Sequence, residues 1–274
     1  MFYTADQVAT MATHQFAQLL WREDNHTLWL TMNRPEAKNT LSPTLLRELA
    51  FAFRYAHYNP EVWSVVLAAA GDVWCAGMDL KALRNGELPN SSTIPPPEQD
   101  IVIAEMVRKM HKPLIAQVAA PVYAGGFLLL CPATYVVAAP EAKFGLPEVK
   151  RGLFPFQVMA ALMEFAPTRQ VIDWCIQGKV LGVAEAKALG LVTHLAEDEQ
   201  GIYQLAQQLC EGLHQNSPSA IRMGLQALDE MRAVDAAAKQ AYLKGLFDSI
   251  QQTADAQEGM AAFIEKRPPV WRGV

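Results

Sequence analysis

Residues 113–140 contain no charged side chain, and this stretch limits the fold more than any other part of the chain. It is long enough for a membrane-spanning helix, but Pro121 and Pro132 lie inside it, with Gly125-Gly126 between them. Prolines interrupt helices, and the Val-rich pieces beside both prolines are typical of strands. The stretch therefore predicts a buried strand, a turn with a short helix, and a second strand, as in a covered parallel sheet.

Strands and helices alternate through the first half of the chain. We expect strands at 26–32, 63–70, 114–119 and 134–138, a helix at 43–57 introduced by Ser42 and Pro43, and a second helix ending near 111. The second half of 81–100, with Gly86 and Pro95-Pro96-Pro97, is interpreted as a mobile loop that covers the site. This alternation predicts an α/β fold with a mostly parallel sheet.

From Pro155 onward the apolar pattern is helical, and only 191–195 still reads as extended. Helices are expected at 156–165, 168–177, 183–189, 199–215, 218–232, 234–252 and 254–265. Such amphipathic helices need a partner surface, either their own core or another subunit. We divide the chain into an N-terminal extension (1–14) that frays from the core, an α/β core (15–200) and a C-terminal helical region (201–274).

Composition excludes several classes of protein. A formal charge of −5 and scattered Lys and Arg residues argue against nucleic acid as a partner. The four cysteines form no CxxC pair, which favours reduced core thiols and a cytoplasmic protein, and the N-terminus does not read as a secretion signal. The six histidines form no cluster with the spacing of metal ligands, and the HExxH motif of zinc proteases is missing, so we expect no metal. The GxSxG motif of serine hydrolases, the GxxxxGK[ST] motif of P-loop proteins and the GxGxxG motif of dinucleotide-binding proteins are missing too, so we expect none of these classes and no nucleotide cofactor.

Two short glycine-containing stretches, 75–80 (CAGMDL) and 123–127 (YAGGF), each follow an apolar strand-like run and open onto a helix. Small residues let the backbone approach a ligand, and the first N–H groups of a helix attract negative charge. Two such corners aimed together would make an oxyanion hole for a thioester carbonyl. Glu148 is available as a base.

These stretches, together with 33–41 (NRPEAKNTL), 144–149 (FGLPEV), 190–192 (GLV) and 258–267 (EGMAAFIEKR), resemble the crotonase superfamily of acyl-CoA enzymes in order and spacing. The resemblance covers about residues 15–272. It implies a crotonase-like ββα spiral core with mostly parallel sheets and a C-terminal helical trimerisation region. It also implies an acyl-CoA substrate from fatty acid metabolism, with coenzyme A as part of that substrate rather than a cofactor, and a homotrimer or hexamer.

The resemblance further implies roles for individual residues. The backbone N–H groups of Met78 and Gly125 would be the oxyanion donors and Glu148 the catalytic acid/base, although a first-turn glutamate can also serve only the helix dipole. Coenzyme A would be bound by Ala37, Lys38, Ala76, Asp79, Leu80, Lys81, Phe263 and Lys266, although a lysine at a helix end is otherwise a solvated charge.

Leu128 is the informative departure from the family pattern. Hydratases of this family usually carry a second glutamate there, three residues beyond the oxyanion glycine. One glutamate suffices to move a proton between C2 and C4 of an enoyl thioester. We therefore expect an enoyl-CoA isomerase, with an enoyl-CoA hydratase that uses Glu148 alone and a catalytically silent CoA-binding oligomer as alternatives.

The segment after Glu148 lacks the glycine-rich turn of many hydratases. We interpret Phe154, Phe156 and Met159, together with Leu128 and Tyr123, as lining the acyl pocket. Plain core packing is the alternative for these apolar residues.

Overall fold

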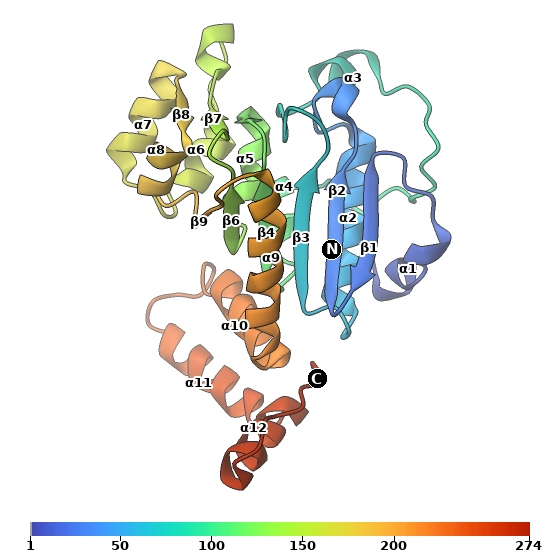
Figure 1. The fold of residues 1–274 in the computed structure, drawn as a ribbon, viewed down its shortest axis with the longest axis vertical. Helices are drawn as coiled ribbons and strands as arrows, with labels where there is room; N and C mark the ends of the chain where they lie inside the picture. The colour runs from blue at the N-terminus through green and yellow to red at the C-terminus, as the bar shows by residue number, and fades with distance from the viewer. Residues whose placement is uncertain (1) are drawn as a thin grey trace.

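The fold is built on a six-stranded sheet, as a computed structural model that describes residues 2–274 shows (Figure 1). The strand order is β1-β2-β3-β4-β6-β9, with β1 and β2 antiparallel and every later neighbour parallel. The strands are β1 (Leu19–Asp24), β2 (Thr27–Met32), β3 (Ser64–Ala69), β4 (Leu114–Val118), β6 (Tyr135–Ala138) and β9 (His194–Leu195). The predicted α/β fold with a mostly parallel sheet is confirmed.

A second, three-stranded sheet runs in the order β5-β7-β8, formed by β5 (Val122–Tyr123), β7 (Lys143–Gly145) and β8 (Val180–Gly182). β5 and β7 are parallel, whereas β7 and β8 are antiparallel. No helix in the described residues is long and apolar enough to cross a membrane. The uncharged stretch 113–140 instead supplies β4, β5, a short helical turn and β6.

The helices and 3₁₀ turns connect and cover these sheets. The α-helices are α1 (Ala5–Ala9), α2 (Pro43–Tyr58), α3 (Leu80–Asn85), α4 (Ile103–Arg108), α5 (Phe127–Leu130), α6 (Phe156–Leu162), α7 (Thr168–Gln177), α8 (Val183–Ala188), α9 (Glu199–His214), α10 (Pro218–Glu230), α11 (Lys239–Ile250) and α12 (Ala254–Glu265). The 3₁₀ turns are η1 (Met11–Thr13), η2 (Pro35–Ala37), η3 (Ala124–Gly126) and η4 (Glu148–Arg151). As predicted, α2 begins with Pro43 after the cap Ser42, whose Oγ accepts a hydrogen bond from the Leu45 N–H.

Alternation along the central strands divides the core into two layers. Val65 and Leu67 of β3 join the main cluster, which includes the buried face of α2, whereas Val66 points to the opposite face. There, Val66, Ile115 and Val137 pack with Ile202 and Ala206 of α9. Helices therefore lie on both faces of the large sheet, α2 behind it and α9 in front (Figure 1). Because α9 spans residues 200 and 201, the boundary that we placed there runs through a helix that packs on the core.

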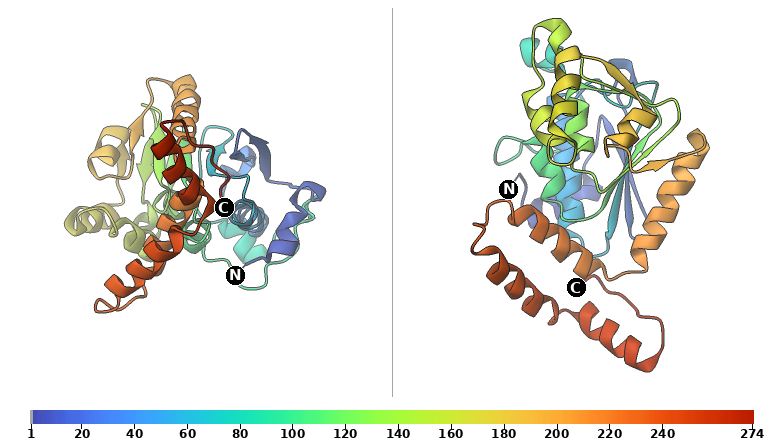
Figure 2. Two further views of the ribbon diagram at one scale, coloured as in Figure 1. Left: turned by 90° about the horizontal axis from the view of Figure 1, so that it is seen from below. Right: turned by 90° about the vertical axis from the view of Figure 1, so that its left-hand side faces the viewer.

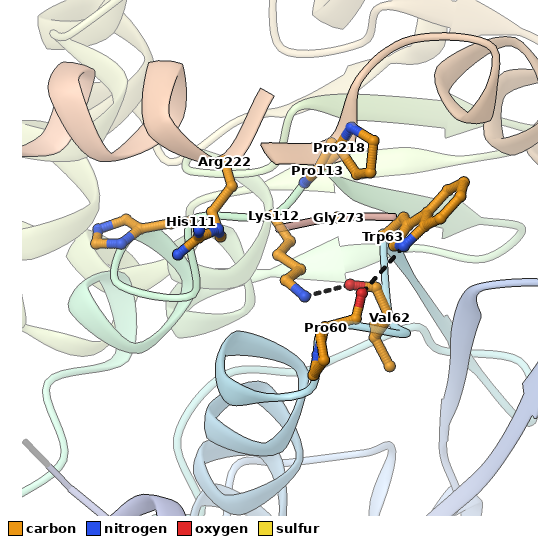
Figure 3. Close-up of a pocket in the computed structure, with 9 residues that line it drawn as sticks. All are labelled: Pro60, Val62, Trp63, His111, Lys112, Pro113, Pro218, Arg222 and Gly273. Carbon is orange, nitrogen blue, oxygen red and sulfur yellow. Dashed lines mark hydrogen bonds between the residues drawn. The ribbon is translucent and has the colours of Figure 1, made fainter. Parts of the chain in front are cut away.

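The last three helices form an arm that extends away from the sheets (Figure 2). α11 buries no residue, and Phe247, Met260, Phe263 and Ile264 are exposed on the arm. Where the arm meets the core, Lys112 is buried and its Nζ donates to the carbonyl oxygen of Val62 (Figure 3). The same Nζ also donates to the carbonyl oxygen of Asn59. Burial, helped by the charge of Arg222 from the arm, lowers the pKa of Lys112 to about 7. The pocket around Lys112 is only about 10 Å³, which is too small for a metabolite.

Two expectations about the N-terminal part are wrong. The extension does not fray, because Phe2, Tyr3, Val8 and Met11 add apolar surface to the main core. The 86–100 segment is not the mobile loop that we expected to cover the site. It is held against the N-terminal segment by hydrogen bonds from Tyr3 Oη to Pro95 O and from the Thr93 N–H to Gln15 O, both at 2.9 Å.

Candidate active site

The first glycine-containing corner is fastened to the loop that precedes α2. Leu41 and Met78 form a parallel bridge, with the Leu41 N–H donating to Gly77 O at 2.8 Å and the Asp79 N–H to Leu41 O at 3.2 Å. The Ala76 N–H donates to Lys38 O at 3.0 Å. These bonds leave the Met78 N–H without a partner among the described backbone groups.

The second corner is the 3₁₀ turn η3, which begins directly after β5. Its first internal hydrogen bond runs from the Phe127 N–H to Ala124 O, so the Gly125 N–H precedes it and has no partner within the turn. The Tyr123 N–H donates to Cys75 O at 2.8 Å, and this bond joins the second corner to the first.

The two corners touch through their glycines. A Cβ on Gly125 would lie 3.4 Å from the Met78 nitrogen, and a Cβ on Gly77 would lie 3.0 Å from the Gly125 nitrogen and 2.8 Å from Ala124 Cβ. Gly77 also has a φ of +90°, which other residues rarely adopt. The close approach explains the glycines, and the structure brings the two candidate oxyanion donors side by side.

Glu148 begins the 3₁₀ turn η4 rather than an α-helix, with Pro147 at the preceding position. Its carboxylate is about half buried, and Oε2 is fully buried without a hydrogen-bond partner among the described residues. Burial raises the pKa of Glu148, against the opposing effects of its own backbone N–H and of the Arg151 charge. A carboxyl group with a raised pKa is a stronger base toward a carbon acid.

The register of parallel segments places Glu148 at the same edge as the two corners. Cys75 pairs with Val122, and Val122 pairs with Phe144, in both cases parallel. Met78 follows Cys75 by three positions, and Gly125 follows Val122 by three. Glu148 follows Phe144 by four positions. The three groups therefore leave the carboxyl ends of adjacent parallel segments, where catalytic groups of α/β folds commonly lie.

The residues interpreted as pocket lining differ in how deeply they are buried. Leu128 is 5% exposed within α5 and belongs to the main core. Phe154 and Met159 are partly buried against that core, whereas Phe156 is 69% exposed and contacts Phe154 with ring centroids 5.1 Å apart. Tyr123 is half buried, and its ring lies over Gly145. The pocket role stays a prediction for all five residues.

The expected coenzyme A residues near the first corner lie together. Ala37 and Lys38 close η2, next to Ala76 through the Lys38 carbonyl, and Leu80 and Lys81 open α3 with exposed side chains. Asp79 differs from this group, because its buried carboxylate is used internally. Oδ1 accepts the N–H groups of Lys81 and Ala82, and Oδ2 accepts from Arg34. The opening N–H groups of α3 are thus occupied.

Phe263 and Lys266 are not brought to this site within the chain. They lie at the end of α12 and just after it, at the opposite end of the molecule from α3 (Figure 1). Phe263 is 85% exposed there. Their contact with a nucleotide stays a prediction.

Several residues that support the site were missed by sequence reasoning. Arg34 and Asn39 hold the loop beside Met78. Cys175 lies near Glu148, and its thiol pKa is raised to about 11 by burial and, to a smaller extent, by the charge of the Glu148 carboxylate. Arg34 and Asn39 were visible as polar residues of the 33–41 stretch, whereas nothing in the sequence singled out Cys175.

Among the described residues, no group of three or more His, Cys, Asp or Glu side chains is placed to hold a metal ion.

Comparison with known proteins finds one family of similar chains. The family model for enoyl-CoA hydratase/isomerase matches residues 22–274. Enoyl-CoA hydratase EchA19 of Mycobacterium tuberculosis is 33% identical over 248 residues, covering 89% of this chain and 92% of the relative. Mevalonyl-coenzyme A hydratase sidH of Aspergillus fumigatus is 29% identical, covering 90% and 92%.

Solved structures show the same fold. The crystal structure of an enoyl-CoA hydratase from Mycobacterium tuberculosis has a TM-score of 0.82 and 30% sequence identity, and the match covers 94% of this chain and all of that one. An enoyl-CoA hydratase from Mycobacterium marinum has a TM-score of 0.80 and 32% identity, with 94% and 100% coverage.

Proposed function

The chain belongs to the enoyl-CoA hydratase/isomerase family, and from this premise we propose that it isomerises the double bond of an enoyl-CoA thioester with Glu148 as the single acid/base. The thioester oxygen accepts hydrogen bonds from the Met78 and Gly125 N–H groups. Glu148 removes a proton from C2 of a 3-enoyl thioester, the electrons shift toward the carbonyl, and the same carboxyl returns the proton at C4. The two amides stabilise the enolate between these steps.

The observation that carries this proposal is the buried carboxylate of Glu148, whose Oε2 has no hydrogen-bond partner among the described residues and whose pKa is raised by burial. Leu128 takes the position where hydratases of the family usually carry their second glutamate, and it is 5% exposed in α5, a short helix whose residues are all buried. Arg151 is the charged neighbour that acts on the Glu148 pKa, and no second carboxylate among the described residues adds to the shift. A lone carboxylate supports proton shuttling better than the orientation of a water molecule.

Hydration of a 2-enoyl-CoA is the second candidate. It is favoured by the names of the relatives, which include enoyl-CoA hydratases and a mevalonyl-coenzyme A hydratase. In this reaction Glu148 would deprotonate a water that attacks C3, and would return a proton to C2. Water would then be held by backbone groups, because Leu128 offers no hydrogen bond.

Assembly into a trimer or a pair of trimers is part of the same proposal. It is supported by the exposed apolar side chains of α11 and α12, which the rest of the described chain leaves uncovered. Light scattering on the purified protein tests the number of subunits.

Turnover of matched 3-enoyl and 2-enoyl thioesters tests the function directly. The proposal expects the 3-enoyl substrate to yield the conjugated 2-enoyl product, with little 3-hydroxyacyl-CoA formed from either substrate. Formation of 3-hydroxyacyl-CoA from the 2-enoyl substrate alone would establish the hydratase instead. Tight acyl-CoA binding without turnover, unchanged in Glu148→Gln, would indicate a silent binding protein.

A further inference from the structure

Arg34 connects the two segments that meet at the Met78 corner. Its Nη1 donates to Asp79 Oδ2 at 2.6 Å, to Thr40 Oγ1 at 3.0 Å and to Thr40 O at 3.3 Å. Thr40 immediately precedes Leu41, and Asp79 immediately follows Met78. One guanidinium group therefore holds both sides of the Leu41–Met78 bridge.

The direction of the Met78 N–H depends on this bridge. The Gly77 carbonyl and the Met78 N–H belong to one planar trans peptide unit, so they point in opposite directions. Because the Leu41 N–H binds Gly77 O at 2.8 Å, the Met78 N–H is directed away from Leu41. The bond from the Asp79 N–H to Leu41 O fixes the next peptide unit. A displacement of Leu41 would therefore turn the Met78 N–H.

The pair between Arg34 and Asp79 is shielded from water. Asp79 is 7% exposed, and the Arg34 side chain is 19% exposed. Burial opposes ionisation of Asp79, but the Ala82 N–H and Arg34 outweigh it and lower the pKa of the carboxyl group. Breaking one side of such a shielded pair leaves an uncompensated charge. The contact is therefore a firm anchor, unlike an exposed ion pair.

Asn39 anchors the same loop to the core. Its side chain is fully buried, with Oδ1 accepting the Arg34 N–H at 2.9 Å and Nδ2 donating to the carbonyl oxygens of Ala70 and Val73 at 2.8 Å each. These two carbonyls lie just beyond the end of β3. The loop is thus fastened to the sheet by Asn39 and to the Met78 corner by Arg34.

We propose that Arg34 is a positioning residue for the reaction, which holds the Met78 N–H on the thioester oxygen through Thr40, Leu41 and Asp79. This inference rests on the proposed function, because it needs a thioester at the two amides. Arg34 does not itself touch the reacting atoms. Its effect is expected mainly in kcat, since an oxyanion contact strengthens in the transition state.

The test compares four variants with the wild-type protein. Arg34→Ala removes the anchor, and Arg34→Lys keeps a positive charge for Asp79 but not the planar guanidinium whose Nη1 also reaches Thr40. Asp79→Asn keeps a helix cap but loses the charge. Arg22→Ala is the matched control, because Arg22 pairs with Asp24 on the surface. Each variant is first checked for a cooperative melting transition well above the assay temperature and for the wild-type subunit number.

Arg34→Ala is expected to lower kcat about 10- to 100-fold with KM changed less than about 3-fold, because a misplacement of about 1 Å can cost 100-fold. Arg34→Lys should be intermediate, Asp79→Asn should resemble Arg34→Ala, and Arg22→Ala should match the wild type. The carbonyl stretch of a bound, unreactive acyl-CoA thioester supplies a second readout. It should move toward its frequency in water in Arg34→Ala and Asp79→Asn, because one amide no longer polarises the carbonyl.

Wild-type kcat in a folded Arg34→Ala or Asp79→Asn variant overturns the positioning role. A lowered kcat with an unchanged stretching frequency of the thioester carbonyl also overturns it, because that result would indicate a general loss of structure. If Arg34→Ala does not fold, Asp79→Asn decides. A wild-type protein that turns over no enoyl-CoA overturns the proposed function instead. Hydrogen exchange of the 76–82 peptide then tests Arg34 alone, and unchanged exchange in Arg34→Ala rules the anchor out.

Discussion

Tyr123 pairs with Gly145 across the parallel strands β5 and β7, and its ring carbon Cδ1 lies 2.7 Å from the point that a Cβ on Gly145 would occupy. Gly125 follows Tyr123 by two residues, and Glu148 follows Gly145 by three. This close contact between two strands thus sets the spacing between an oxyanion donor and the candidate base.

Gly145→Ala should disturb both stability and activity. The added methyl group would meet the Tyr123 ring and, at 3.1 Å, Val180 Cγ2. Overpacking of this kind costs about 1–3 kcal/mol, so chemical denaturation should show that loss and kcat should fall as Glu148 moves. Gly245→Ala is the control, because nothing lies within 4 Å of its Cβ position on α11. A Gly145→Ala variant as stable and active as wild type would contradict the contact.

The pH dependence of kcat/KM should report the raised pKa of Glu148. The base must be ionised, so activity is lost as the pH falls through that pKa, which burial holds above the ordinary value of 4.5. Arg151→Gln removes a charge that favours the carboxylate, and should therefore move the acidic limb to higher pH. Lys150→Gln, on the same turn, should leave the limb in place. A limb that shifts equally in both variants would point to a general charge effect.

Leu128→Glu should shift the balance toward hydration. It adds a second carboxylate three residues after Gly125, and this group can orient water. A positioned acid/base contributes about 10²–10⁴-fold, so even an imperfectly placed one should raise 2-enoyl hydration by about 10-fold over Leu128→Gln, the uncharged control of similar size. Product analysis by chromatography measures the ratio of 3-hydroxy to isomerised product. Equal ratios in the two variants would mean that position 128 does not face the acyl chain.

The C-terminal segment should be fastened to the arm by Asp255. Its fully buried carboxylate accepts the Arg272 N–H at 2.8 Å, the Gly273 N–H at 3.2 Å and the Ser217 hydroxyl at 3.2 Å. Each buried donor left unpaired costs about 1–3 kcal/mol, so Asp255→Ala should lower the free energy of unfolding by at least that amount. Asp248→Ala, which loses only an exposed ion pair to Lys244, should be nearly neutral. Equal melting temperatures would contradict the anchoring role.

The parts of the fold that were predictable have strong local signals. Ser42-Pro43 marks the start of α2, and the valine-rich runs around Val65 and Val136 read as buried strands. β1 was missed because its sequence, LLWRED, alternates poorly. The turn that joins it to β2 uses Asn25 and His26, both with positive φ, in place of the usual Asn-Gly. The pairing β5-β7-β8 is also invisible in the sequence, because these strands are two or three residues long.

The candidate site divides in the same way. The glycines at 77 and 125 and the acid at 148 stand out as motif residues, and the structure gathers their strands at one edge. The internal use of Asp79 was not predictable, since only the folded chain brings Arg34 within 2.6 Å of it. The loop at 86–100 was interpreted as mobile from its prolines, yet its fastening depends on Tyr3 and Gln15, far away in the sequence.

The role of Glu148 is tested most directly by the turnover of a 3-enoyl-CoA in Glu148→Gln, with Glu141→Gln as an exposed control. Because one carboxylate both takes and returns the proton, Glu148→Gln should lose about 10²–10⁴-fold in kcat, the contribution typical of a general acid/base, while still binding acyl-CoA. Glu141→Gln should retain wild-type activity. Isomerisation by Glu148→Gln within about 3-fold of the wild-type rate would rule out Glu148 as the group that moves the proton.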